Sequence, residues 1–194
     1  LFLELCTGGE LLDRLTDDGP LSEAQMRPYA WCLIDALAHC HSRGVVHRDV
    51  KLDNVLLSVE DPGLARLCDF GLAEPCGDGR PLFGVDGTPG YRAPEMHACA
   101  QTGFAGPPCD AFAVGVCLFA LAAGGFPWDE AWAHDPCFAF VAAGQAHGHG
   151  SCALVTAHYK GEGAACPLSA ALQDLIDALL RCDPATRGTL GRAL

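Results

Sequence analysis

Residues 47–54 read His-Arg-Asp-Val-Lys-Leu-Asp-Asn, and the tripeptides Asp69-Phe70-Gly71 and Ala93-Pro94-Glu95 follow further along the chain. Each tripeptide alone would be a weak signal. Three such motifs in this order and at these spacings are poorly explained by chance. The stretch at 47–54 is therefore the part of the sequence that decides the fold.

The polar residues of these motifs suit the transfer of a phosphoryl group. That reaction needs a carboxylate to orient and deprotonate the attacking hydroxyl, oxygen ligands for magnesium, and positive charge near the phosphoryl group. Asp49 can supply the carboxylate and Lys51 the positive charge. Asn54 and Asp69 offer the hard oxygen atoms that magnesium prefers.

Length and charge narrow the class of protein. The chain has 194 residues, half of them hydrophobic, which is enough for one globular domain with a substantial core. The formal net charge of -12 argues against a basic face for nucleic acid, so we expect no nucleic-acid partner. An acidic balance is compatible with a basic peptide substrate, but it is usually just an ordinary solvated surface.

The chain has twelve cysteines, none of them arranged as Cys-x-x-Cys. We expect buried free thiols in an intracellular protein of the cytoplasm or nucleus. His39-Cys40-His41 and His147-Gly148-His149 lack zinc-finger spacing, so neither is expected to bind metal. The apolar run 111–124 has about 14 residues, short of the ~20 that span a bilayer, which favours a buried core helix and no membrane association.

Local patterns predict mainly helices. Ser22 and Gln25 have the spacing of a capping box, which predicts a helix that ends near Gly44. Residues 55–57 and 65–68 read as two strands of a hairpin around a turn at 60–63. The other expected elements are a strand at 1–5, a short helix from Glu10 to Leu15, a long loop at 69–95, helices at 110–124, around 130–145 and at 168–181, and a surface loop at 144–163.

Together, the motifs resemble the eukaryotic protein kinases of the serine/threonine type. The resemblance implies an α+β, mainly α-helical fold: a kinase C-lobe with a short catalytic β-hairpin and most of the N-lobe absent. Residues 1–194 would form a single partial kinase domain, with 1–10 as the last N-lobe strand and hinge and 11–194 as the C-lobe. The implied reaction transfers the γ-phosphoryl group of ATP to serine or threonine hydroxyls of a protein, with Mg²⁺.

The same resemblance implies roles for individual residues. Asp49 would be the catalytic base, Lys51 would neutralise γ-phosphate charge, and Thr88 would bridge the two. Asn54 and Asp69 would hold magnesium. The implied nucleotide-binding residues are Leu3 as gatekeeper, Glu4 and Cys6 through their backbones to adenine, Leu56 beneath adenine, Glu10 at the ribose or a substrate arginine, and Asp53, which with Glu10 would face such an arginine.

Six further positions match structural residues of that family. Glu95 would form a buried ion pair with Arg187. Asp110 would brace the backbone of the catalytic loop, and Phe112 stands where the family usually has tryptophan. His47 and Phe70 are expected to have structural roles, stacking in the hydrophobic spine of the family.

Two departures from the family pattern have consequences. The Gly-rich loop, the strand lysine and its helical glutamate partner are absent from the sequence, which begins at Leu1 rather than Met. We therefore expect a fragment that is inactive alone. Residues 70–87 contain no Ser, Thr or Tyr, although Arg48 would normally bind a phosphate there. Gly84 and Asp86 lie near that place, and we hypothesise that phosphorylation of this loop is not required.

Two other functions stay open from the sequence. A pseudokinase or scaffold would share the fold, but it would have no need of Asp49, Lys51, Asn54 and Asp69 together. A small-molecule kinase of related fold would generally lack Ala93-Pro94-Glu95. Within the protein kinases, the run 1–11 and the run 180–187 resemble the calmodulin-dependent-kinase-like group. The sequence does not specify an oligomeric state.

Overall fold

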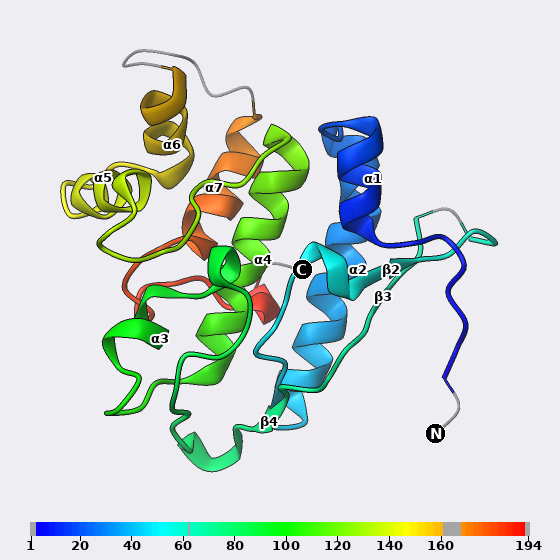
Figure 1. Ribbon diagram of the computed structural model, residues 1–194, viewed down its shortest axis with the longest axis horizontal. Coiled ribbons are helices and arrows are strands. Elements are labelled where there is room, and N and C mark those ends of the chain that lie inside the picture. Colours follow the sequence, from blue (N-terminus) through cyan, green and yellow to red (C-terminus); the bar gives the residue numbers. More distant parts are fainter. Residues whose placement is uncertain (1–2, 62, 161–167, 193–194) are drawn as a thin grey trace.

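The computed structural model describes residues 3–61, 63–160 and 168–192. Helices make up most of it, and two of them run through the centre of the molecule: α2 (Glu23–Ser42) and α4 (Gly106–Ala123). Helix α7 (Ala170–Leu179) packs against the other side of α4 (Figure 1). The smaller helices are α1 (Leu11–Asp18), α3 (Pro94–Ala98), α5 (Pro136–Gln145) and α6 (Ser151–Lys160).

The strands are short and antiparallel. β2 (Val55–Leu57) pairs with β3 (Ala65–Leu67), and β1 (Val45–Val46) pairs with β4 (Glu74–Pro75). Single 3-10 turns occur at Leu52–Asn54, Gly77–Gly79, Pro89–Tyr91 and Leu190–Arg192. This architecture confirms the predicted mainly helical α+β fold with a small hairpin.

Helix α2 begins where the capping box predicts. The side chain of Gln25 accepts a hydrogen bond from the backbone N–H of Ser22 at 3.0 Å, which satisfies a donor that the helix itself cannot use. The helix ends at Ser42, and Gly44 follows with a φ of 70°, a left-handed conformation that glycine adopts without strain.

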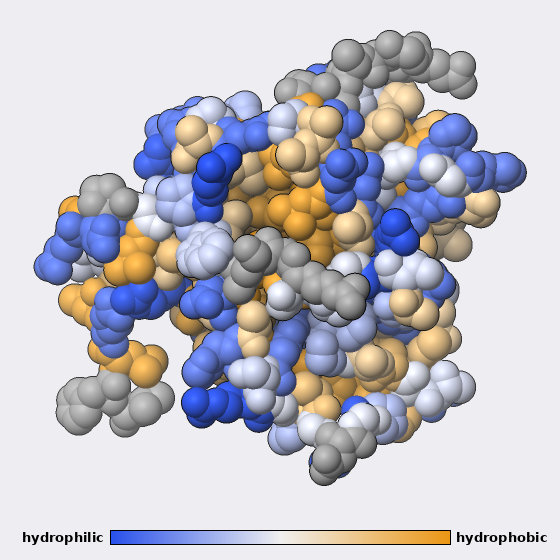
Figure 2. Space-filling view, turned by 180° about the vertical axis from the view of Figure 1, so that it is seen from behind, coloured by the Kyte–Doolittle hydropathy of each residue, from blue (hydrophilic) through white to orange (hydrophobic). Residues whose placement is uncertain are grey.

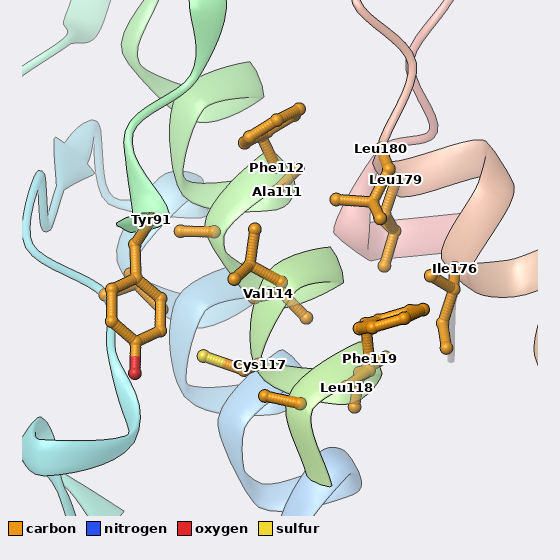
Figure 3. Packing of buried hydrophobic residues seen from close by; sticks show 14 of the residues in the cluster. Tyr91, Ala111, Phe112, Val114, Cys117, Leu118, Phe119, Ile176, Leu179 and Leu180 are labelled. Atoms are coloured by element: carbon orange, nitrogen blue, oxygen red, sulfur yellow. The ribbon is translucent and has the colours of Figure 1, made fainter. Parts of the chain in front are cut away.

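Helix α4 is buried on almost every side. Figure 3 shows its apolar side chains between Tyr91 on one flank and Ile176, Leu179 and Leu180 on the other. Cys117 on this helix has 0% of its surface exposed. Among the described residues, α4 is also the one helix long and apolar enough to cross a membrane by length and composition. Because it is packed inside the fold, it matches the core helix that the sequence predicts.

One face of the molecule leaves part of the apolar interior visible. In the view from behind, hydrophobic residues gather in a recess in the upper middle, with hydrophilic residues to its left and right (Figure 2). The helices therefore do not close completely over the core on this side.

Several expected elements differ from the structure. Residues 3–5 form no strand, and Leu3 and Leu5 are 80% and 85% exposed, because no neighbouring strand pairs with them in the described chain; residues 1–2 lie outside it. The expected loop 144–163 contains α6, and the loop 69–95 contains β4 and the start of α3. Helix α4 begins at Gly106 rather than 110, because prolines at 107 and 108 occupy its first turn, where their missing N–H groups cost nothing.

Candidate active site

The catalytic loop (residues 47–54) is anchored through its backbone by one buried carboxylate. Asp110, in the first half of α4, accepts the backbone N–H of His47 at 2.9 Å on Oδ2 and that of Arg48 at 3.0 Å on Oδ1. Its Oδ2 also lies 2.7 Å from Nε2 of His41. Asp110 therefore fixes the loop just before the reactive positions, which confirms its predicted bracing role.

Asp49 lies at the centre of a small polar cluster. Its Oδ1 accepts hydrogen bonds from the backbone N–H of Thr88 at 2.9 Å and from Thr88 Oγ1 at 2.8 Å. Its Oδ2 lies 3.1 Å from Nζ of Lys51, which also donates to Thr88 Oγ1 at 3.1 Å. The structure thus brings Asp49, Lys51 and Thr88 into mutual contact, although Thr88 lies far along the chain.

The contacts within the cluster stabilise the charged forms of Asp49 and Lys51. Burial raises the pKa of Asp49, but the hydrogen bonds from Thr88 and Lys51 and the charge of Lys51 outweigh this and hold it below its ordinary value. Burial lowers the pKa of Lys51, yet the hydrogen bond and charge of Asp49, together with Asp53 and Asp69, raise it overall. At neutral pH the site therefore presents a carboxylate beside an ammonium group.

The two expected metal ligands are placed by the β2–β3 hairpin. Asn54 precedes β2 and is buried, and its Nδ2 donates to the backbone carbonyl of Asp49 at 2.8 Å. This donation leaves the amide oxygen as the atom available to a cation. The backbone N–H of Cys68 donates to the carbonyl of Asn54 at 2.9 Å, which brings the following residue, Asp69, to the same end of the hairpin.

Asp69 has an exposed carboxylate and a φ of 58°. Its Oδ1 accepts the N–H of Gly71 at 3.1 Å. An amide oxygen and a carboxylate at one hairpin end form a donor set that fits a hard divalent cation. The adjacent Phe70 makes an edge contact with the buried His47, with ring centroids 4.8 Å apart. Phe70 itself is 47% exposed, so its expected place in a hydrophobic spine stays a prediction.

The expected nucleotide-binding residues come from segment 3–10, from the 3-10 turn before β2 and from β2 itself. Leu56 is half-buried and faces away from Val55 and Leu57, which point into the core. Glu10 forms a bridge with Leu56 and serves as the N-cap residue of α1. Leu3 and Glu4 are exposed, Cys6 and Asp53 are half-buried, and Glu4 accepts a hydrogen bond from Arg66 at 2.9 Å. The nucleotide roles of all six residues stay predictions.

The comparisons with known proteins agree with this geometry. The family model described as protein kinase domain matches residues 1–194. The chain belongs to the protein kinase domain family.

Individual relatives of this kinase domain come from plants. It is 42% identical over 131 residues, 67% of the chain, to a CBL-interacting serine/threonine-protein kinase 24 of Arabidopsis thaliana. It is 37% identical over 195 residues, 98% of the chain, to a CBL-interacting protein kinase 11 of Oryza sativa subsp. japonica. The aligned part makes up 28% and 34% of these two relatives, so the chain spans about a third of their length or less.

A buried ion pair lies outside the Asp49 cluster, between Arg187 and Glu95. Arg187 donates from Nη1 to Glu95 Oε1 at 2.5 Å and from Nη2 to Oε2 at 2.8 Å. Its guanidinium also lies 4.9 Å from the ring centre of Phe112. This bidentate pair confirms the predicted partnership and ties the end of the 69–95 segment to the C-terminal part of the fold.

Sequence reasoning identified Arg48 and Asp86 but not how they are arranged. The guanidinium of Arg48 is bound by two carboxylates, Glu74 and Asp86, from opposite ends of one loop. Arg92 was also missed as a site residue; its Nη2 donates to the carbonyl of Gly87 at 2.6 Å, and its Nη1 contacts Glu130 at 3.1 Å. The opposite charges suggest that these residues could form ion pairs. Because they lie far apart in the sequence, the sequence does not show which of them pair.

Proposed function

We propose that this kinase domain, within its full-length protein, transfers the γ-phosphoryl group of ATP to serine or threonine hydroxyls of protein substrates. The observation that carries the proposal is the cluster of Asp49, Lys51 and Thr88, in which one carboxylate is held on both oxygens. The position of Lys51, two residues after Asp49, supports the serine/threonine type, as do relatives that are named serine/threonine-protein kinases.

Asp49 would act mainly by orienting the attacking hydroxyl. A carboxylate with a lowered pKa is a weak base, so it accepts a hydrogen bond from the hydroxyl and takes the proton late in the reaction. Because Thr88 and Lys51 already fix both oxygens, the carboxylate needs no reorganisation when the substrate arrives. Lys51 would place positive charge beside the transferred group.

Asn54 and Asp69 would hold the divalent cation, for which Mg²⁺ is the expected ion. The amide oxygen of Asn54 and the exposed carboxylate of Asp69 are the atoms available for it. A bound magnesium ion supplies positive charge to the phosphate oxygens of ATP. Leu56, half-buried on the outer face of β2, would contact the adenine ring of the nucleotide.

Replacing Asp49 by Asn in the full-length protein tests the proposal. We expect kcat to fall by about 10²- to 10⁴-fold, because the amide cannot take the proton. The fold should be retained, because the amide oxygen can still accept from Thr88. Asp35→Asn on the exposed face of α2 is the matched control and should leave kcat unchanged. Turnover retained in Asp49→Asn would show that Asp49 is not the base.

The substrate would be basic around its target residue. Support comes from Glu10 and Asp53, two carboxylates at positions that match those facing a substrate arginine in similar kinases, and from the net charge of -12. Glu10→Gln and Asp53→Asn should raise the KM of arginine-containing peptides about tenfold and leave that of alanine-substituted peptides unchanged. An equal effect on both peptides would assign the two residues to the nucleotide instead.

A further inference from the structure

We propose that Asp86 is a positioning residue for Asp49. In this proposal, the carboxylates of Asp86 and Glu74 hold Arg48 and thereby keep the catalytic loop ordered without phosphorylation of residues 70–87. The kinetic part of the proposal rests on the proposed function. Its structural part, the ordering of the loop by two carboxylates, is independent of it.

The burial of Arg48 is the first observation. Only 5% of its side chain is exposed, and its Nη2 lies 2.6 Å from Asp86 Oδ2 and 3.1 Å from the carbonyl of Phe83. Its Nη1 contacts the carboxylate of Glu74. An ion pair between exposed groups contributes little, but a guanidinium withdrawn from water depends on the anions that it meets.

The contact between the catalytic loop and the segment 69–95 is the second observation. Three consecutive residues of that segment contact two consecutive residues of the catalytic loop. Asp86 binds the side chain of Arg48, Gly87 packs against its backbone carbonyl, and Thr88 donates twice to Asp49. A side chain added at Gly87 would place Cβ 2.6 Å from the carbonyl oxygen of Arg48, so the packing is tight. A shift of Asp86 would therefore be transmitted to Asp49 through Thr88.

The backbone holds the rest of the loop in the same place. β4, which carries Glu74, pairs with β1 immediately before the catalytic loop. Leu82 forms a bridge with Phe104, and the N–H of Gly84 donates to the carbonyl of Ala100 at 2.9 Å. Both carboxylates are thus presented to Arg48 from anchored segments.

The sequence of the loop is the third observation. Residues 70–87 contain no Ser, Thr or Tyr, so this loop has no hydroxyl that could be phosphorylated. The next hydroxyl residue is Thr88, whose Oγ1 already donates to Asp49 and accepts from Lys51. Two carboxylates supply a charge close to that of one phosphate group, and they are present permanently.

A kinetic experiment on the full-length protein tests the positioning role. We expect Asp86→Asn to lower kcat by about 10- to 100-fold with the KM for ATP unchanged. The substitution would displace Asp49, which orients the attacking hydroxyl and does not bind the nucleotide. Asp86→Glu should restore most of the activity, and Asp35→Asn should match the wild type. Treatment of the wild type with a protein phosphatase should leave kcat unchanged. Loss of activity on that treatment, or no rescue by Asp86→Glu, would overturn the proposal.

Hydrogen exchange tests the structural part without any need for activity. In Asp86→Asn, the amide of Thr88 and those of residues 84–87 should exchange faster than in the wild type, while the amides of α4 stay protected. Unchanged exchange of Thr88 would overturn the proposal. If Asp86→Asn does not fold, Glu74→Gln removes the other carboxylate and should show the same effects. Faster exchange in a protein with no kinase activity would contradict the proposed function alone.

Discussion

At the scale of single residues, Arg187 makes a buried charged contact outside the catalytic cluster. Its guanidinium and the carboxylate of Glu95 are both buried, so removing one partner leaves an unpaired charge. Arg187→Ala should lower the free energy of unfolding by about 3–5 kcal/mol, measured by urea denaturation. Arg43→Ala, a matched change at an exposed arginine, should cost no more than about 0.5 kcal/mol. A loss of similar size in both variants would mean that the ion pair adds nothing.

The shifted pKa values of Asp49 and Lys51 predict how the stability of the fold depends on pH. The lowered pKa of Asp49 stabilises the fold above the ordinary carboxylate pKa of about 4, and this contribution is lost as pH falls through the lowered pKa. The raised pKa of Lys51 stabilises the fold below its ordinary pKa of about 10.4, and this contribution is lost as pH rises through the raised value.

The stability difference between the wild type and Asp49→Asn should therefore be constant from about pH 5 to pH 9. It should change towards the value for a protonated aspartate only at lower pH. Urea denaturation of both proteins at pH 3, 5, 7 and 9 measures this difference. A change between pH 5 and pH 9 would show that another group titrates with the cluster.

Individual site residues could be predicted to different degrees. Phosphoryl transfer calls for the residue types of Asp49, Lys51 and Asn54, but their individual roles came from the family resemblance and stay predictions. The bridge by Thr88 and the pair of Glu95 with Arg187 followed from the family resemblance. The two partners of Arg48 could not be assigned, because several acidic residues in the loop have equal charge. Only the path of the chain selects Glu74 and Asp86.

At the scale of elements, the contact between α4 and α7 depends on a glycine. A Cβ at Gly115 would lie 2.8 Å from Leu180 Cδ2 and 2.9 Å from Leu179 Cβ. Gly115→Ala should therefore lower the free energy of unfolding by about 1–3 kcal/mol despite the better helix propensity of alanine. Gly125→Ala is the control, because nothing lies within 4 Å of its Cβ position. Thermal unfolding of both variants, with only Gly115→Ala affected, is the expected result.

Elements with strong local signals were predicted, and elements made by distant contacts were not. The capping box of α2 and the β2–β3 hairpin depend on neighbouring residues, and both are present. β4 has two residues and exists only because it meets β1. Helix α6 lies in a glycine- and histidine-rich stretch, and its buried face forms against α5 and α7 rather than from a strong sequence period.

At the scale of the whole molecule, the proposed function assigns one side of an ATP site to the described residues. They would provide the base, the cation ligands and the surface beneath the nucleotide, while the sequence contains no Gly-rich strand pair to cover the phosphates. We expect the polypeptide 1–194 alone to show negligible ATP-dependent phosphorylation of a protein substrate. Incorporation of labelled phosphate measures this, with Asp49→Asn as background. Incorporation above that background would show that these residues suffice for transfer.

Because α4 is buried, the chemical reactivity of Cys117 on this helix would report how often the core opens. Cys117 has no exposed surface, and burial raises the pKa of its thiol, so alkylating reagents cannot reach a reactive thiolate in the closed fold. Its modification would require that α4 separate from α2 and α7, so its labelling rate would follow global unfolding. Half-buried thiols such as Cys6 would react through local fluctuations. A time course of alkylation, read residue by residue, would thus measure the stability of the core without any denaturant.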